Sequence, residues 1–138
     1  MTIIIYDGKK LVTDSGCTGG DMRFGQAKKH YILKDGSILA CAGSLEDISM
    51  VIEWLKDEEQ PRPVIEDFEA IRVYNNGSYQ IYTEKLFPFV TSLPVFLGSG
   101  MPFAAGAYSV SKNALKSAKA ACLCSLCCEL PINDIKFY

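Results

Sequence analysis

Histidine is almost absent from this chain, since His30 is the only one among 138 residues. Any Ser-His-Asp or Cys-His mechanism would therefore have to use this residue. The sequence has no G-x-S-x-G elbow and no catalytic-cysteine motif to accompany it. His30 also stands on an expected strand directly after Lys28 and Lys29. We therefore expect a structural or surface role for His30 rather than histidine-based catalysis.

The chain also lacks an excess of either charge. Lysine and arginine total 14 against 16 aspartate and glutamate residues, which gives a formal net charge of −2. No basic stripe breaks this balance, so nucleic acid is not an expected partner. The first residues carry no basic region, and their apolar run is too short for a signal peptide or a membrane span. We expect a cytoplasmic protein with a single domain over residues 1–138.

Six cysteines are present, but they do not predict a disulfide framework. Four of them lie in one short apolar run near the C-terminus: Cys122, Cys124, Cys127 and Cys128. This clustering favours reduced thiols, most of them in the core. The alternative is a metal site, because Cys124 and Cys127 have the C-x-x-C spacing that zinc uses. No second pair and no nearby histidine completes four ligands, so we expect no metal.

Apolar runs separated by turn residues predict two hairpins in the first third of the chain. Strands over 2–6 and 11–13 flank a turn at Asp7 and Gly8, and strands over 31–33 and 37–42 flank a turn that ends at Gly36. The glycine-rich segment 15–20 between the hairpins is expected to be a loop. These patterns predict that antiparallel strands open the fold.

The pattern then changes from strand to helix spacing. Ser44 is a predicted N-cap of a helix that holds Trp54 in the core and ends before Pro61 and Pro63. Strands follow over 68–82, around Asn75, Asn76 and Gly77, and over 94–97. Two helices come next. The first can start at Pro102, and the second can be capped by Asn113. One apolar face of the second helix is formed by Leu115, Ala118, Cys122 and Leu126. An edge strand over 131–137 closes an α+β fold of stacked sheets covered by helices.

Gly98, Ser99 and Gly100 lie between an expected strand and an expected helix. A dinucleotide-binding motif would need a third glycine where Phe103 stands, and a complete βαβ unit cannot follow so near the C-terminus. A tight turn whose backbone amides and serine hydroxyl face a cleft is the alternative interpretation.

Thr2 follows Met1, and a small second residue permits removal of the methionine. The new terminus would then combine a hydroxyl nucleophile with a free α-amine. An α-amino group has an unperturbed pKa of about 7.7–8.0, so it can accept the hydroxyl proton near neutral pH. Many proteins begin with this dipeptide, so the pair alone predicts nothing, and its meaning depends on the motifs that follow.

Those motifs occur in a consistent order along nearly the whole chain. They are the opening strand from Thr2, the strand over 11–16 with Asp14, the pair Lys28 and Lys29, the strand-to-helix segment of Ala42, Gly43 and Ser44, and Gly98, Ser99 and Gly100 followed by Phe103, Ala104 and Ala105. In these motifs the chain resembles the proteasome β-subunit family, especially the bacterial HslV peptidase and related small phage and bacterial forms, which belong to the N-terminal nucleophile hydrolases.

The resemblance implies a role for each of five residues. Thr2 would be the nucleophile, Lys29 the cation that favours its alkoxide, and Asp14 the acid that pairs with the lysine. Ser99 would orient the amine, and Gly43 would supply an oxyanion amide at a helix N-terminus, where the dipole favours negative charge. Taken singly, each of these residues also has an ordinary structural interpretation, and between the two adjacent lysines the choice of Lys29 stays open.

The resemblance also implies a four-layer αββα sandwich, a homo-oligomeric ring, and hydrolysis of peptide or unfolded protein without any cofactor. An ATP-dependent unfoldase is a candidate partner. One departure is Ser125, which stands about where the family has an aspartate that supports the threonine amine. The alternative is therefore a catalytically inactive binding or ring-assembly subunit that keeps Met1.

Overall fold

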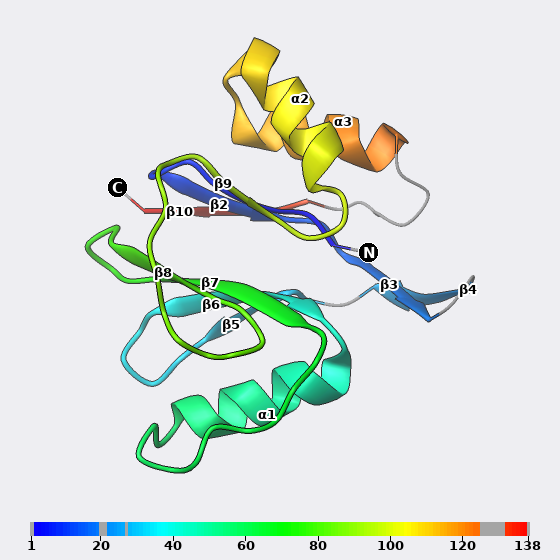
Figure 1. Cartoon of the computed structure of the whole chain (residues 1–138). Coiled ribbons are helices and arrows are strands. Elements are labelled where there is room, and N and C mark those ends of the chain that lie inside the picture. The colour runs from blue at the N-terminus through cyan, green and yellow to red at the C-terminus, as the bar shows by residue number, and fades with distance from the viewer. Residues whose placement is uncertain (1, 20–21, 27, 125–131, 138) are drawn as a thin grey trace.

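The computed structural model describes residues 2–19, 22–26, 28–124 and 132–137, with the backbone alone for 16–19 and 22–26. Within these ranges it contains two four-stranded antiparallel sheets, a two-stranded ribbon and three helices (Figure 1). The predicted α+β class is confirmed. No helix in this part of the chain is long and apolar enough to cross a membrane.

The first sheet has the strand order β10-β2-β1-β9. Its strands are β1 (Ile4–Tyr6), β2 (Lys10–Thr13), β9 (Val95–Leu97) and β10 (Asn133–Lys136). The hairpin of β1 and β2 forms as predicted, because the Asp7 carboxylate accepts hydrogen bonds from the N–H groups of Lys9 and Lys10. β10 pairs with β2 at one side of the sheet, so the predicted closing edge strand is confirmed over the residues described.

The second sheet has the order β5-β6-β7-β8. Its strands are β5 (His30–Ile32), β6 (Ile38–Gly43), β7 (Phe68–Val73) and β8 (Tyr79–Tyr82). The predicted turns are present, and Gly36 and Gly77 have φ values of 83° and 86°. These positive values explain why glycine follows the turn-forming residues at both places.

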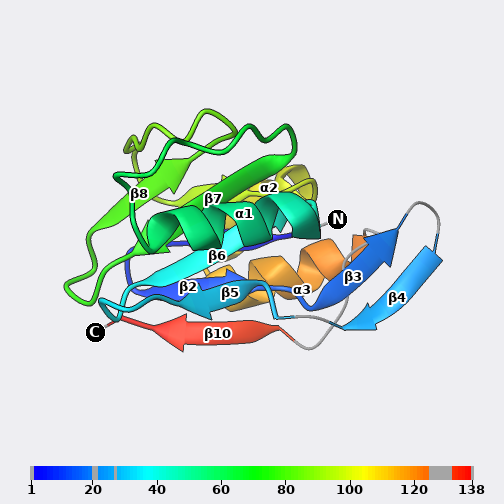
Figure 2. The same ribbon diagram turned by 90° about the horizontal axis from the view of Figure 1, so that it is seen from below.

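The glycine-rich segment between the hairpins differs from the prediction. It was expected to be a loop over 15–20, but Gly16–Gly19 forms β3 and pairs with β4 (Met22–Gln26) in a ribbon that extends away from the two sheets (Figure 2). Antiparallel pairing is made by backbone hydrogen bonds, so it does not require the β-branched side chains on which the prediction depended. The register shifts between Cys17 and Thr18, which fits the tendency of strand glycines to mark bulges.

Three helices cover the outer faces of the sheets. α1 (Leu45–Leu55) begins at the predicted cap Ser44, whose hydroxyl accepts a hydrogen bond from the Asp47 N–H at 3.2 Å. α2 (Met101–Ser111) and α3 (Ala114–Cys124) follow β9, and Asn113 caps α3 by accepting from the Lys116 N–H. Figure 1 shows α2 and α3 over the first sheet and α1 beneath the second.

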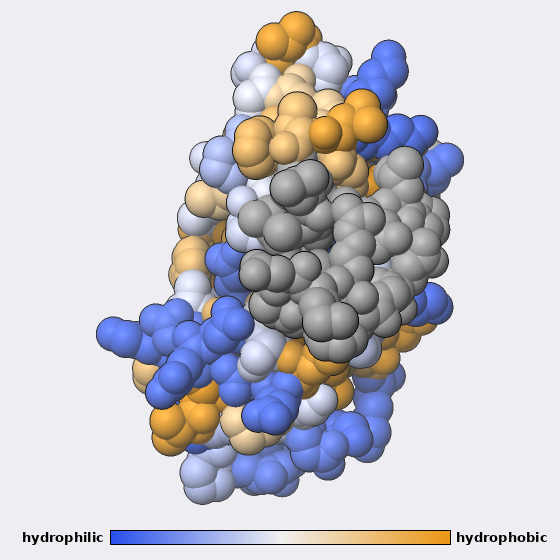
Figure 3. Space-filling model, turned by 90° about the vertical axis from the view of Figure 1, so that its right-hand side faces the viewer, coloured by the Kyte–Doolittle hydropathy of each residue, from blue (hydrophilic) through white to orange (hydrophobic). Residues whose placement is uncertain are grey.

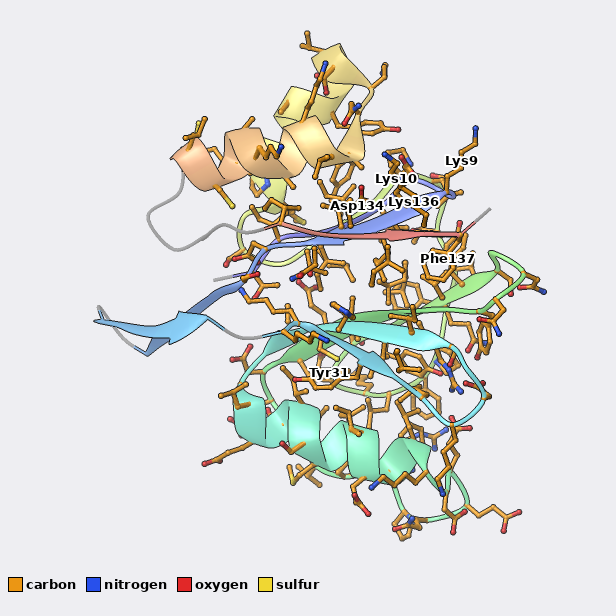
Figure 4. All side chains as sticks on the ribbon, turned by 180° about the vertical axis from the view of Figure 1, so that it is seen from behind. Lys9, Lys10, Tyr31, Asp134, Lys136 and Phe137 are labelled. Carbon is orange, nitrogen blue, oxygen red and sulfur yellow. The ribbon has the colours of Figure 1, made fainter. Side chains whose placement is uncertain are left out.

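Three apolar clusters fill the spaces between these elements. The cluster between the sheets contains Tyr6, Leu11, Ile71 and Val73, with Phe137 packed against it. A second cluster joins the second sheet to α1, and Trp54 belongs to it as predicted. Tyr31 points from β5 toward α1 in this cluster (Figure 4). The third joins Ile3 and Val12 of the first sheet to Ala118 of α3.

The cysteine prediction is confirmed only in part. Cys41 is buried, Cys122 is half-buried and Cys124 is exposed, and Cys41 and Cys124 are free thiols. Of these, Cys41 fits the expectation that most cysteines lie in the core, whereas Cys124, the last residue of α3, does not. Leu126, Cys127 and Cys128 lie outside the described residues, so one of the two cysteines of the metal alternative, Cys127, does too. Within the described part, no group of three or more potential metal ligands lies together.

Candidate active site

Thr2 and Asp14 are brought together by the pairing of the first two strands. The Ile3 N–H donates to Asp14 Oδ1 at 3.0 Å, and the Asp14 N–H donates to the Ile3 carbonyl at 3.3 Å. The backbone bond extends the β1–β2 ladder by one pair beyond Ile4 and Thr13, and the bond to Oδ1 fixes the Asp14 side chain next to Ile3. Asp14 is fully buried, so its carboxylate needs charged or hydrogen-bonding partners.

Lys29 supplies such a partner from the second sheet. Its Nζ lies 2.9 and 3.1 Å from the two carboxylate oxygens of Asp14, and 3.1 Å from Thr2 Oγ1. The backbone carbonyl of Lys29 accepts from the Cys41 N–H on the neighbouring strand, which fixes its place at the start of β5. Lys29 is 9% exposed, whereas the adjacent Lys28 is exposed to solvent. Of the two lysines, Lys29 is the one that reaches Thr2.

This ion pair has a direct chemical consequence for the threonine hydroxyl. An ammonium group donates hydrogen bonds in three directions, and Lys29 directs donors to Asp14 and to Thr2 Oγ1. Charge interactions are strong here because both side chains are almost removed from water. A cation fixed next to Oγ1 stabilises the negative charge that develops there when the hydroxyl loses its proton.

The turn after β9 lies against the backbone of Thr2. Gly98 has a φ of 90°, and a Cβ at this position would lie 2.0 Å from the Thr2 carbonyl oxygen. The Gly100 N–H donates to the same carbonyl at 3.2 Å. Only glycine at position 98 therefore permits this approach. Ser99 lies on this turn and is exposed, and its predicted role toward the Thr2 amine stays a prediction.

Gly43 ends β6 and directly precedes the cap of α1. It has a φ of 134°, and a Cβ at this position would lie 2.0 Å from the Asp67 carbonyl oxygen. Its amide thus stands at a strand-to-helix junction, as predicted, where the helix dipole favours negative charge. Its role as an oxyanion donor stays a prediction.

Asp47 fixes the segment that packs on Gly43. Its Oδ2 accepts from the N–H groups of Glu66 at 3.1 Å and Asp67 at 2.9 Å. The pKa of Asp47 lies below its ordinary value, mainly because of the hydrogen bond from Asp67 and next because of the one from Glu66. Burial raises this pKa, and a hydrogen bond with Ser44 lowers it by less. Because the pKa is lower in the folded state, Asp47 contributes stability above its unfolded pKa of about 3.9 and loses that contribution as the pH falls further.

We therefore expect the variant Asp47→Ala to show a weaker dependence of stability on pH than the parent between about pH 5 and pH 3. The measurement is the urea midpoint at a series of pH values. Glu46→Ala is the matched control, because it removes a carboxylate from the same helical turn but leaves the bonds to Glu66 and Asp67 intact. Parallel pH curves for Asp47→Ala and the parent would contradict this role of Asp47.

Some residues of this region were missed by the sequence analysis. Glu69 Oε1 accepts from the Gly98 N–H at 2.6 Å, and Asn133 donates to the hydroxyls of Ser15 and Thr13 at 3.2 and 3.4 Å, on either side of Asp14 in the chain. Glu69 had a detectable signal, because a carboxylate interrupts the apolar alternation of its strand. Asn133 had none, since its partners are 118 and 120 residues away.

Other predicted positions lie apart from the residues around Thr2, or outside the residues that the structure describes. His30 is half-buried on β5, and burial followed by the charge of Lys28 lowers its pKa. Its Nδ1 is buried and has no hydrogen-bond partner in the described part of the chain. Met1 and Ser125 lie outside the described residues, so the removal of the methionine and the effect of the missing aspartate stay predictions.

Comparison with solved structures identifies the fold. The chain is similar to Thiobacillus denitrificans BPH in complex with epoxomicin, with a TM-score of 0.73 and 16% identity over 100% of both chains. It is also similar to eukaryotic HslV from Trypanosoma brucei, with a TM-score of 0.71 and 17% identity over 99% of this chain and 98% of that one. The chain has the HslV-type fold.

A second structure of Thiobacillus denitrificans BPH matches the HslV-type fold of this chain almost as well, with a TM-score of 0.72 and 14% identity over 99% and 98% of the two chains. No family model and no curated protein matches the sequence. At these identities the similarity concerns the fold. The resemblance seen in the short sequence motifs is therefore confirmed for the fold. The chemistry has to be argued from the residues around Thr2.

Proposed function

We propose that this protein is a threonine-type peptidase that uses Thr2 as its N-terminal nucleophile once Met1 has been removed. The observation that carries the proposal is the position of Lys29 Nζ, 3.1 Å from Thr2 Oγ1, while the same ammonium is paired with the buried Asp14. A threonine hydroxyl is a poor nucleophile until a base and a nearby cation activate it. Lys29 is that cation, and the freed α-amine is the base.

In the first half of the reaction, Thr2 Oγ1 attacks the carbonyl carbon of the scissile peptide bond while its proton passes to the α-amine. The resulting oxyanion is stabilised by the Gly43 N–H. The carbon–nitrogen bond then breaks, the leaving amine takes the proton, and a threonyl ester remains. Water attacks this ester with the amine again as base, which releases the acid and restores Thr2. Lys29 stabilises Oγ1 whenever it carries negative charge, and Ser99 orients the amine.

The layers of the fold support a four-layer αββα sandwich of the N-terminal nucleophile hydrolase type. We further propose that the protein acts in the cytoplasm on peptide or unfolded protein as a homo-oligomeric ring, with an ATP-dependent unfoldase as a candidate partner. Exposed apolar side chains on α2 support association. Met101 and Phe103 are each 46% exposed and Val110 is 87% exposed. Figure 3 shows hydrophobic atoms gathered where α2 and α3 lie.

Labelling by epoxomicin tests the proposed nucleophile. One similar structure holds this compound, and we expect it to modify the protein once, with the added mass on the peptide that begins at Thr2. The intact mass before labelling should lack Met1. Thr2→Ala is the control and should stay unmodified. Modification at another residue would contradict the proposal, and complete retention of Met1 in the native host would favour the inactive subunit.

A further inference from the structure

Glu69 is a charged residue of β7 on the side of the strand that faces the first sheet. Its neighbours Phe68 and Ala70 pack toward α1, whereas Ile71 and Val73 belong to the cluster between the two sheets. Side chains alternate along a strand, so Glu69 faces the first sheet together with Ile71. A half-buried carboxylate in this position needs a hydrogen-bond donor, and the other sheet supplies one.

That donor belongs to the turn that touches Thr2. Glu69 Oε1 accepts from the Gly98 N–H at 2.6 Å. The Gly98 carbonyl in turn accepts from the Met101 N–H at 3.1 Å, and the Gly100 N–H donates to the Thr2 carbonyl at 3.2 Å. The carboxylate therefore fixes the first residue of a turn whose third residue holds the backbone of the proposed nucleophile. A hydrogen bond to a charged acceptor is stronger than one between neutral groups.

The backbone of Glu69 pairs with β6, the strand that carries Gly43. In the β6–β7 ladder Glu69 lies opposite Ala42, and Phe68 lies opposite Gly43. One side chain thus connects the backbone beside the proposed oxyanion donor with the turn around Thr2. Lys29 also connects the two sheets at this end, but it acts on Thr2 Oγ1, whereas Glu69 acts on the backbone that carries Thr2.

We propose that Glu69 is a positioning residue that sets the place of Thr2 relative to Lys29 and Gly43 through the turn at 98–100. This inference rests on the proposed function. Reactions of this kind depend on placement, and a misplacement of about 1 Å can cost on the order of 100-fold in rate. Without the carboxylate, the turn keeps its sequence but loses the bond that fixes it to the second sheet.

Two variants separate the hydrogen bond from the rest of the side chain. Glu69→Gln keeps an oxygen that can accept from Gly98, and Glu69→Met keeps the length of the stem but removes the oxygen acceptor. We expect Glu69→Met to lower kcat and the rate of epoxomicin labelling at Thr2 by about tenfold or more, with little change in KM. Glu69→Gln should stay within about threefold of the parent, since it keeps the bond without the charge. Glu84→Ala, which removes an exposed glutamate, is the control and should change neither quantity.

Hydrogen exchange at the Gly98 amide gives a readout that does not depend on activity. We expect this amide to exchange about tenfold faster in Glu69→Met than in the parent, and to stay protected in Glu69→Gln. Unchanged Gly98 exchange in Glu69→Met would overturn the inference, and so would equal loss of labelling in both variants. If Glu69→Met fails to fold, the exchange rate of the Gly98 amide in Glu69→Gln becomes the test. A loss of protection of this amide in Glu69→Gln would overturn the inference.

These measurements distinguish the two proposals. If the parent protein is not labelled at Thr2, the proposed function fails, whereas the exchange data still show whether Glu69 anchors the turn. If the parent is labelled at Thr2 and Glu69→Met is labelled at the same rate, the proposed function stands and the positioning role is overturned.

Discussion

Thr2→Ala is expected to abolish peptide hydrolysis and leave the fold intact. The substitution removes the oxygen that Lys29 contacts at 3.1 Å, so the proposed threonyl ester cannot form. Loss of a nucleophile in a comparable hydrolase lowers kcat on the order of 10⁶-fold. Thr2 is half-buried at the end of a strand whose apolar residues stay in place, so stability should change little. The measurements are turnover of a peptide substrate and the urea midpoint.

Thr2→Ser is the matched control for this variant, because it keeps the hydroxyl and the α-amine and loses only a methyl group. It should remain able to hydrolyse peptide and to be labelled. Turnover by Thr2→Ala at the rate of the parent would remove Thr2 from the mechanism. Loss of turnover in both variants together with unfolding would indicate that the residue is structural.

The sequence predicted most of the local structure because its turns and caps are built from neighbouring residues. Asp7 accepts from the N–H groups two and three residues on, and Ser44 accepts from that of Asp47. Such bonds depend on a few adjacent positions, so residue type alone specifies them. The β3–β4 ribbon was missed because its pairing is carried by the backbone, and glycine-rich sequence gives no strand pattern to detect.

The contacts within the candidate site were harder to predict from the sequence. The choice between Lys28 and Lys29 depends on which of the two side chains faces Thr2, and the chain direction there is held by the hydrogen bond from the Cys41 N–H to the Lys29 carbonyl across the second sheet. The contact of Glu69 with Gly98 could not be predicted, because Gly98 is 29 residues away on the other sheet. Long-range contacts of this kind are fixed by how the two sheets stack, which short motifs do not encode.

The buried pair of Asp14 and Lys29 should affect stability and activity separately. Lys29→Met removes the ammonium from a carboxylate that is fully buried, and breaking a buried pair in this way costs about 3–5 kcal/mol of unfolding free energy. Hydrolysis should also be lost, because the cation next to Thr2 Oγ1 is gone. Urea unfolding measures the first effect and peptide turnover the second.

A second substitution tells these effects apart. In the double variant Asp14→Asn with Lys29→Met, the asparagine oxygen can still accept from the Ile3 N–H, and neither member of the pair carries a charge. Replacing both members of a buried pair by uncharged groups is often close to neutral, so the double variant should recover most of the stability lost in Lys29→Met. It should remain inactive, because restored stability does not return a cation to Thr2. A double variant no more stable than Lys29→Met would mean that the cost comes from lost packing of the lysine stem. Recovery of turnover in the double variant would mean that Thr2 acts without Lys29.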